Sequence, residues 1–235
     1  SGLEITINAH PVRTKDFSWD TDLNFSTNKN KVKSLAGGVA LVGYGQWTDV
    51  VTRSAEGDEL YAFYGYKTDG VYTSFEDLIS SPVDMRSNSN PVVTNADGTK
   101  SWSTNPGDYN PKTTTYIGDV KFVDFNGDGI IDENDKTKIG SAMPKWTFGW
   151  NNTFRYKNLD LTVFVNGSIG NKVGNYMKMK LTHMNSPWQN QLVDCGNHAL
   201  LAPKNGQAVD NWYYDASNVI VTNPDCAYPR ASIND

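Results

Sequence analysis

Apolar and polar residues alternate at every second position in four segments of the chain. The first segment, 3–9, has Leu, Ile, Ile and Ala on one side and Glu, Thr and Asn on the other. Segments 17–27, 147–156 and 159–168 repeat the pattern, mainly with Phe, Trp, Leu, Val and Tyr on the apolar side. A period of two places successive side chains on opposite faces of a strand. The sequence therefore predicts four β-strands, each with one face in an apolar medium and the other in water.

The connections between these strands differ greatly in length. Residues 10–16, which include Pro11, are predicted to form a short turn, and residues 157–158 a tight hairpin turn. The segments 28–146 and 169–235 are long and polar, which predicts loop regions. Strands of about ten residues, with short turns on one side and long extracellular loops on the other, are typical of outer-membrane barrels. The pattern favours an all-β fold, an antiparallel transmembrane β-barrel fragment with long loops.

A soluble β-sandwich is the alternative that the alternation leaves open, because its strands also have an inner and an outer face. Such a fold would leave the segment between the second and third strands unusually long. Within that segment, residues 60–66 favour a strand, and Ser74 with Asp77 indicates a weak capping box that opens a short helix through Ile79. Residues 87–111 favour a loop, and a loop helix is expected within residues 171–184.

One stretch carries the spacing of a calcium-binding loop. Oxygen-bearing side chains stand at loop positions 1, 3, 5, 9 and 12, position 7 offers a backbone carbonyl, and Gly129 stands at position 6. The predicted ligands are Asp124, Asn126, Asp128, Ile130, Asp132 and Asp135. Calcium takes six to eight oxygens at about 2.3 to 2.6 Å, and the glycine allows the chain to wrap around the ion. We expect a structural Ca²⁺ site here.

Two departures from an EF-hand argue against a regulatory calcium switch. Position 12 is Asp135, which reaches less far than Glu, and the loop follows a strand-like segment, 120–123, instead of a helix. The alternative interpretation is an Asp/Asn/Gly turn that binds no ion, and such a turn must accommodate four carboxylates in one loop. Lys136 and Lys138 could supply part of the compensating charge.

Composition and charge exclude several other classes of protein. Hydrophobic residues make up 38% of the chain and aromatic residues 12%, so the chain is ordered but polar between its strands. The net charge is −5, and no Lys/Arg cluster interleaves with aromatic residues, which excludes a nucleic-acid partner. The longest apolar run, 35–44, is short and contains three glycines, so no transmembrane helix is expected.

No catalytic motif is recognisable. His10, His183 and His198 lie in unrelated segments, and none accompanies a Ser or Cys in a nucleophile motif. The spacing of Cys195 and Cys226 fits no metal or redox motif, and it leaves open one disulfide or two free thiols. We expect no enzyme activity.

Four segments, taken in order, resemble a known family. Residues 1–19 look like a late barrel strand, turn and strand. Residues 63–70 (FYGYKTDG) resemble a loop signature, 118–129 (GDVKFVDFNGDG) an acidic loop, and 144–149 (PKWTFG) the strand that follows. Together they are similar to the SusC/RagA group of TonB-dependent outer-membrane transporters. The similarity extends to about Gly170 and is weakest beyond residue 171.

The resemblance implies a larger protein and several partners. It implies a barrel of about 22 strands with an internal plug, located in the outer membrane of a Gram-negative cell and in contact with its lipid. A SusD-like surface lipoprotein would capture oligosaccharides or peptides, and TonB would energise import through an N-terminal region missing here. The plug, that region and the final strands would lie outside this chain.

Two other functions remain open at this point. In a secreted, calcium-stabilised β-sandwich that binds carbohydrate, the same strands would pack as two sheets. Trp47, Trp102, Trp188 and Trp212 would then stack on sugar rings. A fragment of an extracellular hydrolase is the weaker option.

Overall fold

The computed structural model describes residues 1–45, 50–184, 188–208 and 210–231. The chain divides into two compact units, and each is built from two separate stretches of sequence. The first unit contains Ser1–Tyr64 and Lys138–Gly174, and the second contains Gly65–Thr137 and Asn175–Asp235. Among the described residues, no helix is long and apolar enough to cross a membrane.

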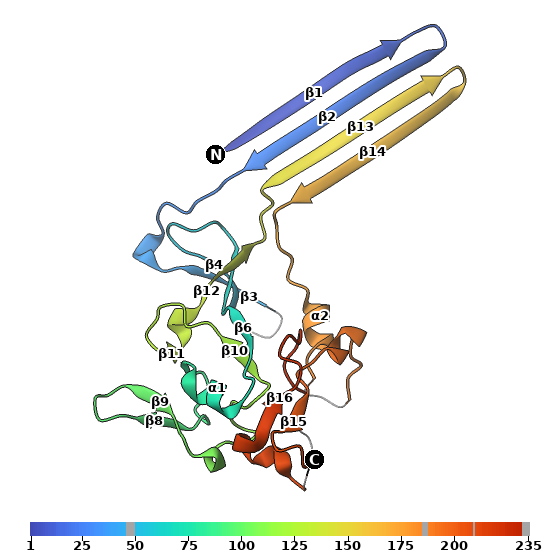
Figure 1. The fold of residues 1–235 in the computed structure, drawn as a ribbon. Coiled ribbons are helices and arrows are strands. Elements are labelled where there is room, and N and C mark those ends of the chain that lie inside the picture. The colour runs from blue at the N-terminus through green and yellow to red at the C-terminus, as the bar shows by residue number, and fades with distance from the viewer. Residues whose placement is uncertain (46–49, 185–187, 209, 232–235) are drawn as a thin grey trace. The chain divides into compact units, whose positions relative to one another are not determined.

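A four-stranded antiparallel sheet dominates the first unit (Figure 1). Its strands, in spatial order, are β1 (Gly2–Arg13), β2 (Phe17–Asn28), β13 (Trp146–Tyr156) and β14 (Leu159–Ile169). β2 and β13 pair directly over their whole length, although more than a hundred residues separate them in the sequence. The four predicted strands are therefore present and lie side by side.

The turn predicted over residues 10–16 is wrong in extent. β1 continues to Arg13, and the register between β1 and β2 shifts between Ala9 and Val12, so Pro11 lies at an irregularity in the strand. A proline has no N–H to donate to the ladder, and it is therefore tolerated at such an irregularity. The second connection is as short as predicted: Lys157 has φ of 53° and β14 begins at Leu159.

A smaller sheet completes the first unit. Its strands, in spatial order, are β12 (Thr137–Ser141), β5 (Ala62–Gly65), β4 (Val50–Ser54) and β3 (Leu41–Tyr44), and a short 3-10 helix, Ala36–Gly38, precedes β3. β5 and β12 each cross the boundary between the units by one residue. β5 lies within the strand predicted over 60–66.

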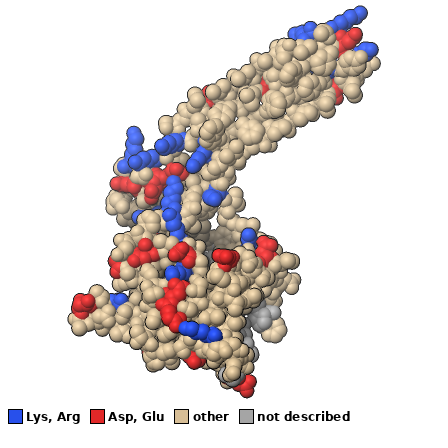
Figure 2. All heavy atoms as spheres, in the orientation of Figure 1, with Lys and Arg blue, Asp and Glu red and all other residues tan. Residues whose placement is uncertain are grey.

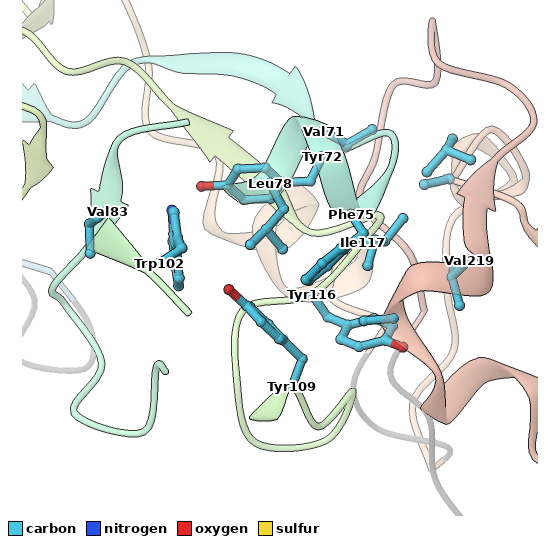
Figure 3. Packing of buried hydrophobic residues seen from close by; sticks show 13 residues of the cluster. Val71, Tyr72, Phe75, Leu78, Val83, Trp102, Tyr109, Tyr116, Ile117 and Val219 are labelled. Carbon is cyan, nitrogen blue, oxygen red and sulfur yellow. The ribbon is translucent and has the colours of Figure 1, made fainter. Parts of the chain in front are cut away.

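The second unit has a hydrophobic core built from short elements, shown in Figure 3. Its strands are β6 (Thr68–Val71), β7 (Val83–Asp84), β8 (Val92–Thr94), β9 (Lys100–Trp102), β10 (Val120–Phe122), β11 (Ile130–Ile131), β15 (Leu201–Pro203) and β16 (Val219–Val221). Its α-helices are α1 (Phe75–Ser80) and α2 (Tyr176–Leu181), and its 3-10 helices are Pro106–Asp108, Glu133–Asp135, Val193–Gly196, Trp212–Tyr214 and Ala216–Asn218. The strands form four separate two-stranded pairs, β6 with β10, β7 with β11, β8 with β9 and β15 with β16.

The core shows that the predicted loop regions 28–146 and 169–235 contain folded structure. Tyr72, Leu78 and Tyr116 are almost fully buried and come from the first stretch, whereas Val219 comes from the second (Figure 3). The loop predicted over 87–111 is also wrong, because it contains the β8–β9 hairpin. Whether these segments are extracellular stays a prediction.

The two predicted helices are present. Ser74 caps α1, and its hydroxyl accepts the N–H of Asp77 at 3.2 Å. Helix α2 lies inside the segment 171–184, where its N-cap, Asn175, accepts the N–H of Lys178 at 2.8 Å.

Candidate functional site

The register of the four long strands gathers the apolar residues on one face of the sheet. Successive cross-strand rows on this face lie two residues apart along each strand, except at the register shift between Ala9 and Val12, so the alternation seen in sequence is in phase across all four strands. One central row contains Ile7, Leu23, Trp150 and Val165. The face as a whole contains Leu3, Ile5, Ile7, Ala9, Val12, Phe17, Trp19, Thr21, Leu23, Phe25, Thr27, Trp146, Phe148, Trp150, Asn152, Phe154, Tyr156, Leu159, Leu161, Val163, Val165, Gly167 and Ile169.

No second sheet among the described residues covers this apolar face. Trp150, Leu161 and Val163 are 44%, 56% and 42% exposed. The inner face of a β-sandwich would be buried against its partner sheet. The exposed face therefore contradicts the sandwich alternative.

The polar side chains in the middle of the apolar face are hydrogen-bonded to tryptophans. The indole N–H of Trp19 donates to Asn152 Oδ1 at 3.0 Å, and the indole N–H of Trp150 donates to Thr21 Oγ1 at 2.9 Å. Asn152 is only 4% exposed. An unpaired polar group is costly in an apolar medium, so these pairs make the face compatible with one.

Aromatic residues concentrate near both ends of the apolar face. Trp19 stacks on Phe154 near the short turns, with ring centroids 5.8 Å apart, and Phe25 meets Trp146 edge-to-face at the opposite end. The ring of Phe148 lies over Gly167, where an added β-carbon would be 2.7 Å from the ring. Aromatic girdles at both ends of an apolar band are a feature of membrane barrels.

The opposite face is polar and carries a ladder of side-chain contacts. Asp20 accepts from Arg155 at 2.6 Å and lies 2.5 Å from His10 Nδ1. Asn8 donates to Asp22 at 2.6 Å. Phe164 is the aromatic exception and is exposed on this face. In Figure 2, the body of the sheet is almost free of charged side chains on the visible face, and charges gather at its two ends.

The predicted calcium ligands lie in one loop of the second unit, where their side chains cap backbone N–H groups. Asp124 accepts from the N–H groups of Gly127 and Gly129 at 2.7 Å each, and Asp128 accepts from Ile130 at 2.9 Å. Asn126 accepts from the N–H of Asp128 at 3.0 Å and donates to its carboxylate at 2.9 Å. The first half of the motif is therefore one tight turn.

Asp132 and Asp135 form the second half of the motif as a reciprocal capping box on the 3-10 helix Glu133–Asp135. Asp135 is buried, and its two oxygens accept from the N–H groups of Phe125 and Asp132 at 2.8 and 2.7 Å. Among the described residues, no three His, Cys, Asp or Glu side chains are arranged to hold a metal ion. The calcium site stays a prediction.

Of the two lysines expected to compensate the acidic loop, Lys136 pairs with Glu133 inside the loop at 2.6 Å and Lys138 with Glu59 outside it at 3.1 Å. The hydrogen bond from Lys136 lowers the pKa of Glu133. The carbonyls of Gly129 and Ile131 accept the N–H groups of Val83 and Met85, on the side of β7. Successive carbonyls alternate in direction along a strand, so the carbonyl of Ile130 points away from β7.

Two arginine–aspartate pairs line a cavity of about 490 Å³ in the second unit. Arg86 binds both oxygens of Asp84, at 2.9 and 2.6 Å, and its guanidinium lies 3.8 Å from the ring centre of Phe122. Arg230 is 2.8 Å from Asp119, whose pKa is raised by burial although the arginine opposes that effect. Sequence reasoning missed both pairs: Asp84 and Arg86 are two residues apart but belong to no motif, and Asp119 is 111 residues from Arg230.

The candidate sugar-binding tryptophans do not form a common surface. Trp102 is 2% exposed and belongs to the core, and Trp212 packs against it, whereas Trp188 is 92% exposed. Trp47 lies outside the described residues. The sequence-based prediction of four stacking residues is therefore wrong for Trp102.

The cysteines and histidines are likewise dispersed. Cys195 and Cys226 are free thiols, which decides between the two alternatives left open by their spacing. His198 contacts the carbonyl of Cys195 at 2.9 Å, and His183 lines the cavity.

Comparison with known proteins identifies the family. The chain is 33% identical over 189 residues to TonB-dependent receptor P3 of Formosa agariphila, covering 77% of this chain and 16% of the receptor. It is 26% identical over 174 residues to TonB-dependent receptor SusC of Bacteroides thetaiotaomicron, covering 73% of this chain and 14% of SusC. The whole chain also resembles 20% of one chain in the structure of the RagAB peptide transporter, with a TM-score of 0.53 at 15% identity. The chain belongs to the SusC/RagA group of TonB-dependent receptors.

No protein-family model matches the chain. This chain spans only about 16% of the length of TonB-dependent receptor P3. It spans the same share of TonB-dependent receptor P26 of Formosa agariphila, to which it is 32% identical. The family predicted from the four sequence segments is confirmed. The predominance of strands agrees with the all-β fold of TonB-dependent receptors. The relatives are receptors and transporters, not enzymes.

Proposed function

We propose that this chain is part of an outer-membrane, TonB-dependent nutrient importer that takes up oligosaccharides or peptides. The strands β1, β2, β13 and β14 form part of its transmembrane wall, with their apolar face in lipid. The short turns face the periplasm, and the second unit lies on the extracellular side. A SusD-like surface lipoprotein delivers substrate, and TonB supplies energy through a part of the receptor outside this chain.

The exposed apolar face of the four-stranded sheet is the observation that supports this proposal most strongly. Soluble monomers rarely expose a contiguous apolar patch larger than a few hundred Å². Here the apolar face extends along strands of 11 and 12 residues. Strands of this length cross a bilayer when tilted, and the central polar groups on this face are already hydrogen-bonded.

The edges of the same sheet support its place in a closed barrel. β1 and β14 each have one side without a partner among the described strands. Lipid cannot hydrogen-bond an open strand edge, so membrane strands occur in closed barrels. We therefore propose that other strands of the longer receptor pair with β1 and β14, in a barrel of about 22 strands.

The cavity of the second unit is the proposed contact for substrate. It places the Arg86–Asp84 and Arg230–Asp119 pairs beside Phe122. Charged pairs with hydrogen-bonding capacity and an aromatic ring suit sugar hydroxyl groups and peptide amides equally well. This equality is the reason for proposing both substrate classes.

Deletion of the full-length gene tests the importer function. We expect the deletion strain to lose growth on one oligosaccharide or peptide of a panel in which each compound is the sole nutrient. The tagged receptor should fractionate with the outer membrane and co-purify with a surface lipoprotein. Recovery of the receptor in the soluble fraction, or unchanged growth on the whole panel, would contradict the proposal.

We further propose that Ca²⁺ stabilises the loop 124–135 through the six positions predicted from sequence. Support comes from the tight turn around Asp124, from the Ile130 carbonyl, which is turned away from β7, and from Lys138, which pairs with Glu59 outside the loop. Calcium titration of the full-length receptor checks this proposal, and Asp97→Ala, in a separate hairpin turn, is the matched control.

A further inference from the structure

Three lysines stand directly beyond the end of the apolar sheet that is opposite the short turns. Lys29 follows β2, Lys145 precedes β13, and Lys172 comes three residues after β14 ends. All three are exposed, and none is within ion-pair distance of a carboxylate in the described part of the chain. The chain therefore has unpaired positive charge at this end of the sheet.

Contacts in the first unit place these lysines at the sheet end. The N–H of Lys145 donates to the carbonyl of Ile169 at 2.9 Å, and the N–H of Lys172 donates to that of Ser141 at 2.6 Å. The Lys145 side chain lies over Gly170, where an added β-carbon would be 3.0 Å from it. Lys145 therefore flanks the ends of β13 and β14, whereas Lys172, whose side chain lies over Gly140, lies beside β12 just beyond β14.

A cavity of about 330 Å³ lies at the same end and is lined by Lys29, Lys145, Asn28, Asn30, Glu59 and Met143, among others. Glu59 is the one carboxylate in this lining. It pairs with Lys138 at 3.1 Å; hydrogen bonds from Ser141 and Lys138 lower its pKa, and the charge of Lys145 adds to this effect. The cavity therefore offers two lysines and two amide side chains to an anion.

The lysines border the last row of the apolar face. That row contains Leu3, Thr27, Trp146 and Ile169, and the last of these is 57% exposed. Apolar surface followed directly by cationic side chains matches a molecule with acyl chains and an anionic head group. Lysine stems also extend readily from apolar surface towards a polar boundary.

The short-turn end of the same sheet has a different arrangement of charge. There Asp20 neutralises Arg155 at 2.6 Å and lies beside His10, and Asp160 lies 3.9 Å from Arg155. Arg13, Lys15 and Lys157 also stand at the short turns, where no carboxylate in the described part of the chain forms an ion pair with them. What distinguishes the loop end is the cavity that Lys29 and Lys145 line.

We propose that Lys29, Lys145 and Lys172 bind the phosphorylated head group of a glycolipid in the outer leaflet of the membrane. The inference rests on the proposed function, which places the loop end of the sheet outside. Gram-negative outer leaflets consist largely of phosphorylated glycolipid, and basic clusters beside a membrane span bind anionic head groups. The glycolipid would anchor this part of the barrel wall in the outer leaflet.

Binding of monophosphorylated lipid A to the full-length receptor in detergent tests the proposal. The variant K29Q/K145Q/K172Q is compared with R13Q/K15Q/K157Q, which removes the same charge at the short turns. Each lysine near an anionic surface contributes roughly a factor of five in affinity, so we expect a loss of about 100-fold for the first variant. The turn-end variant should change the affinity by less than about threefold, and K29R/K145R/K172R should retain binding.

Two further probes identify the source of the phosphate. Dephosphorylated lipid A should bind the wild type as weakly as phosphorylated lipid A binds the triple glutamine variant. Soluble glucosamine 1-phosphate should compete poorly, because it lacks acyl chains. Competition by this compound at the affinity of the lipid would overturn the proposal in favour of a site for soluble anions.

Equal losses in both charge variants, or no loss in K29Q/K145Q/K172Q, would also overturn the proposal. Lipid contact by a label at Val163 is measured on the same preparations. If that label contacts lipid while the triple variant binds lipid A normally, the head-group site is wrong and the membrane wall stands. If the label is in water, the proposed function itself has failed.

Discussion

Placing a positive charge in the centre of the apolar face should strongly destabilise the receptor in a bilayer. β14 has 11 residues, and Val165 lies next to its midpoint in the row with Trp150. At about 3.3 Å per residue and a tilt of about 45°, the strand spans roughly 26 Å, which matches the apolar band of a membrane barrel. Val165 is therefore near the bilayer centre, too far from either surface for an arginine to reach water easily.

The expected cost of Val165→Arg is about 2–4 kcal/mol, the range for an arginine on the lipid face at the membrane midplane. Asn166→Arg is the matched control, because Asn166 is on the same strand but is exposed on the polar face, opposite Gly149. The control should change stability by about 0.5 kcal/mol or less, as surface substitutions usually do.

Guanidinium titration of the full-length receptor, folded into phospholipid vesicles, measures both variants against the wild type. Loss of the heat-modifiable folded band on a gel gives an independent readout of folding. If Val165→Arg is no more destabilising than Asn166→Arg, the apolar face is not in lipid, and the assignment of the two faces is refuted.

Three further predictions concern single contacts. Asn152→Ala should lower the free energy of unfolding by about 1–3 kcal/mol in the same titration, because the Trp19 indole N–H loses its acceptor. Recovery of stability in the double variant with Trp19→Phe would support this cause, and unchanged stability in the single variant would contradict it. Calcium should raise the thermal unfolding midpoint of the wild type but not that of Asp128→Ala, and the absence of binding heat in a calorimetric titration at millimolar Ca²⁺ would rule out the site. Asp119→Ala should cost about 3 kcal/mol, near the lower end for breaking a buried pair, because Arg230 is only 7% exposed; a change below about 1 kcal/mol in denaturant titration would show that the pair is dispensable.

The long strands could be predicted from sequence because a single rule, alternation over ten residues, determines them. The rule failed at residues 10–13, where the register shift beside Pro11 interrupts the alternation although the strand continues. It also could not reveal the pairing of β2 with β13, because register depends on which rows of side chains meet across more than a hundred residues. The bond between Trp19 and Asn152 follows from that register and was therefore hidden as well.

The second unit was missed for a different physical reason. Its strands have two to four residues, too few for any period to emerge, and its core joins residues such as Phe75 and Val219 from distant stretches. A polar composition rich in Asn, Ser, Thr and Gly was read as loop, yet these residues form the caps and turns between buried positions. The Arg230–Asp119 pair could not be predicted for the same reason, since only the fold brings these two residues together.

The acidic loop shows how far spacing alone can be trusted. The turn around Asp124 could be anticipated, because its short-range side chain to backbone bonds follow from Asp, Asn and Gly at fixed offsets. The burial of Asp135 could not, since it depends on the packing of the 3-10 helix that it caps. Spacing thus predicted the local turn and missed how the second half of the motif is used.

Spin labels placed one at a time at residues 160–168 of the full-length receptor test the two-faced sheet most directly. Cys195 and Cys226 are first replaced by serine, and the receptor is reconstituted in vesicles. We expect oxygen, which concentrates in lipid, to relax labels at 161, 163, 165 and 167 most strongly, and a water-soluble nickel chelate to relax the even-numbered labels. A nickel effect that is equal at odd and even positions, or strongest at the odd ones, would contradict the membrane assignment.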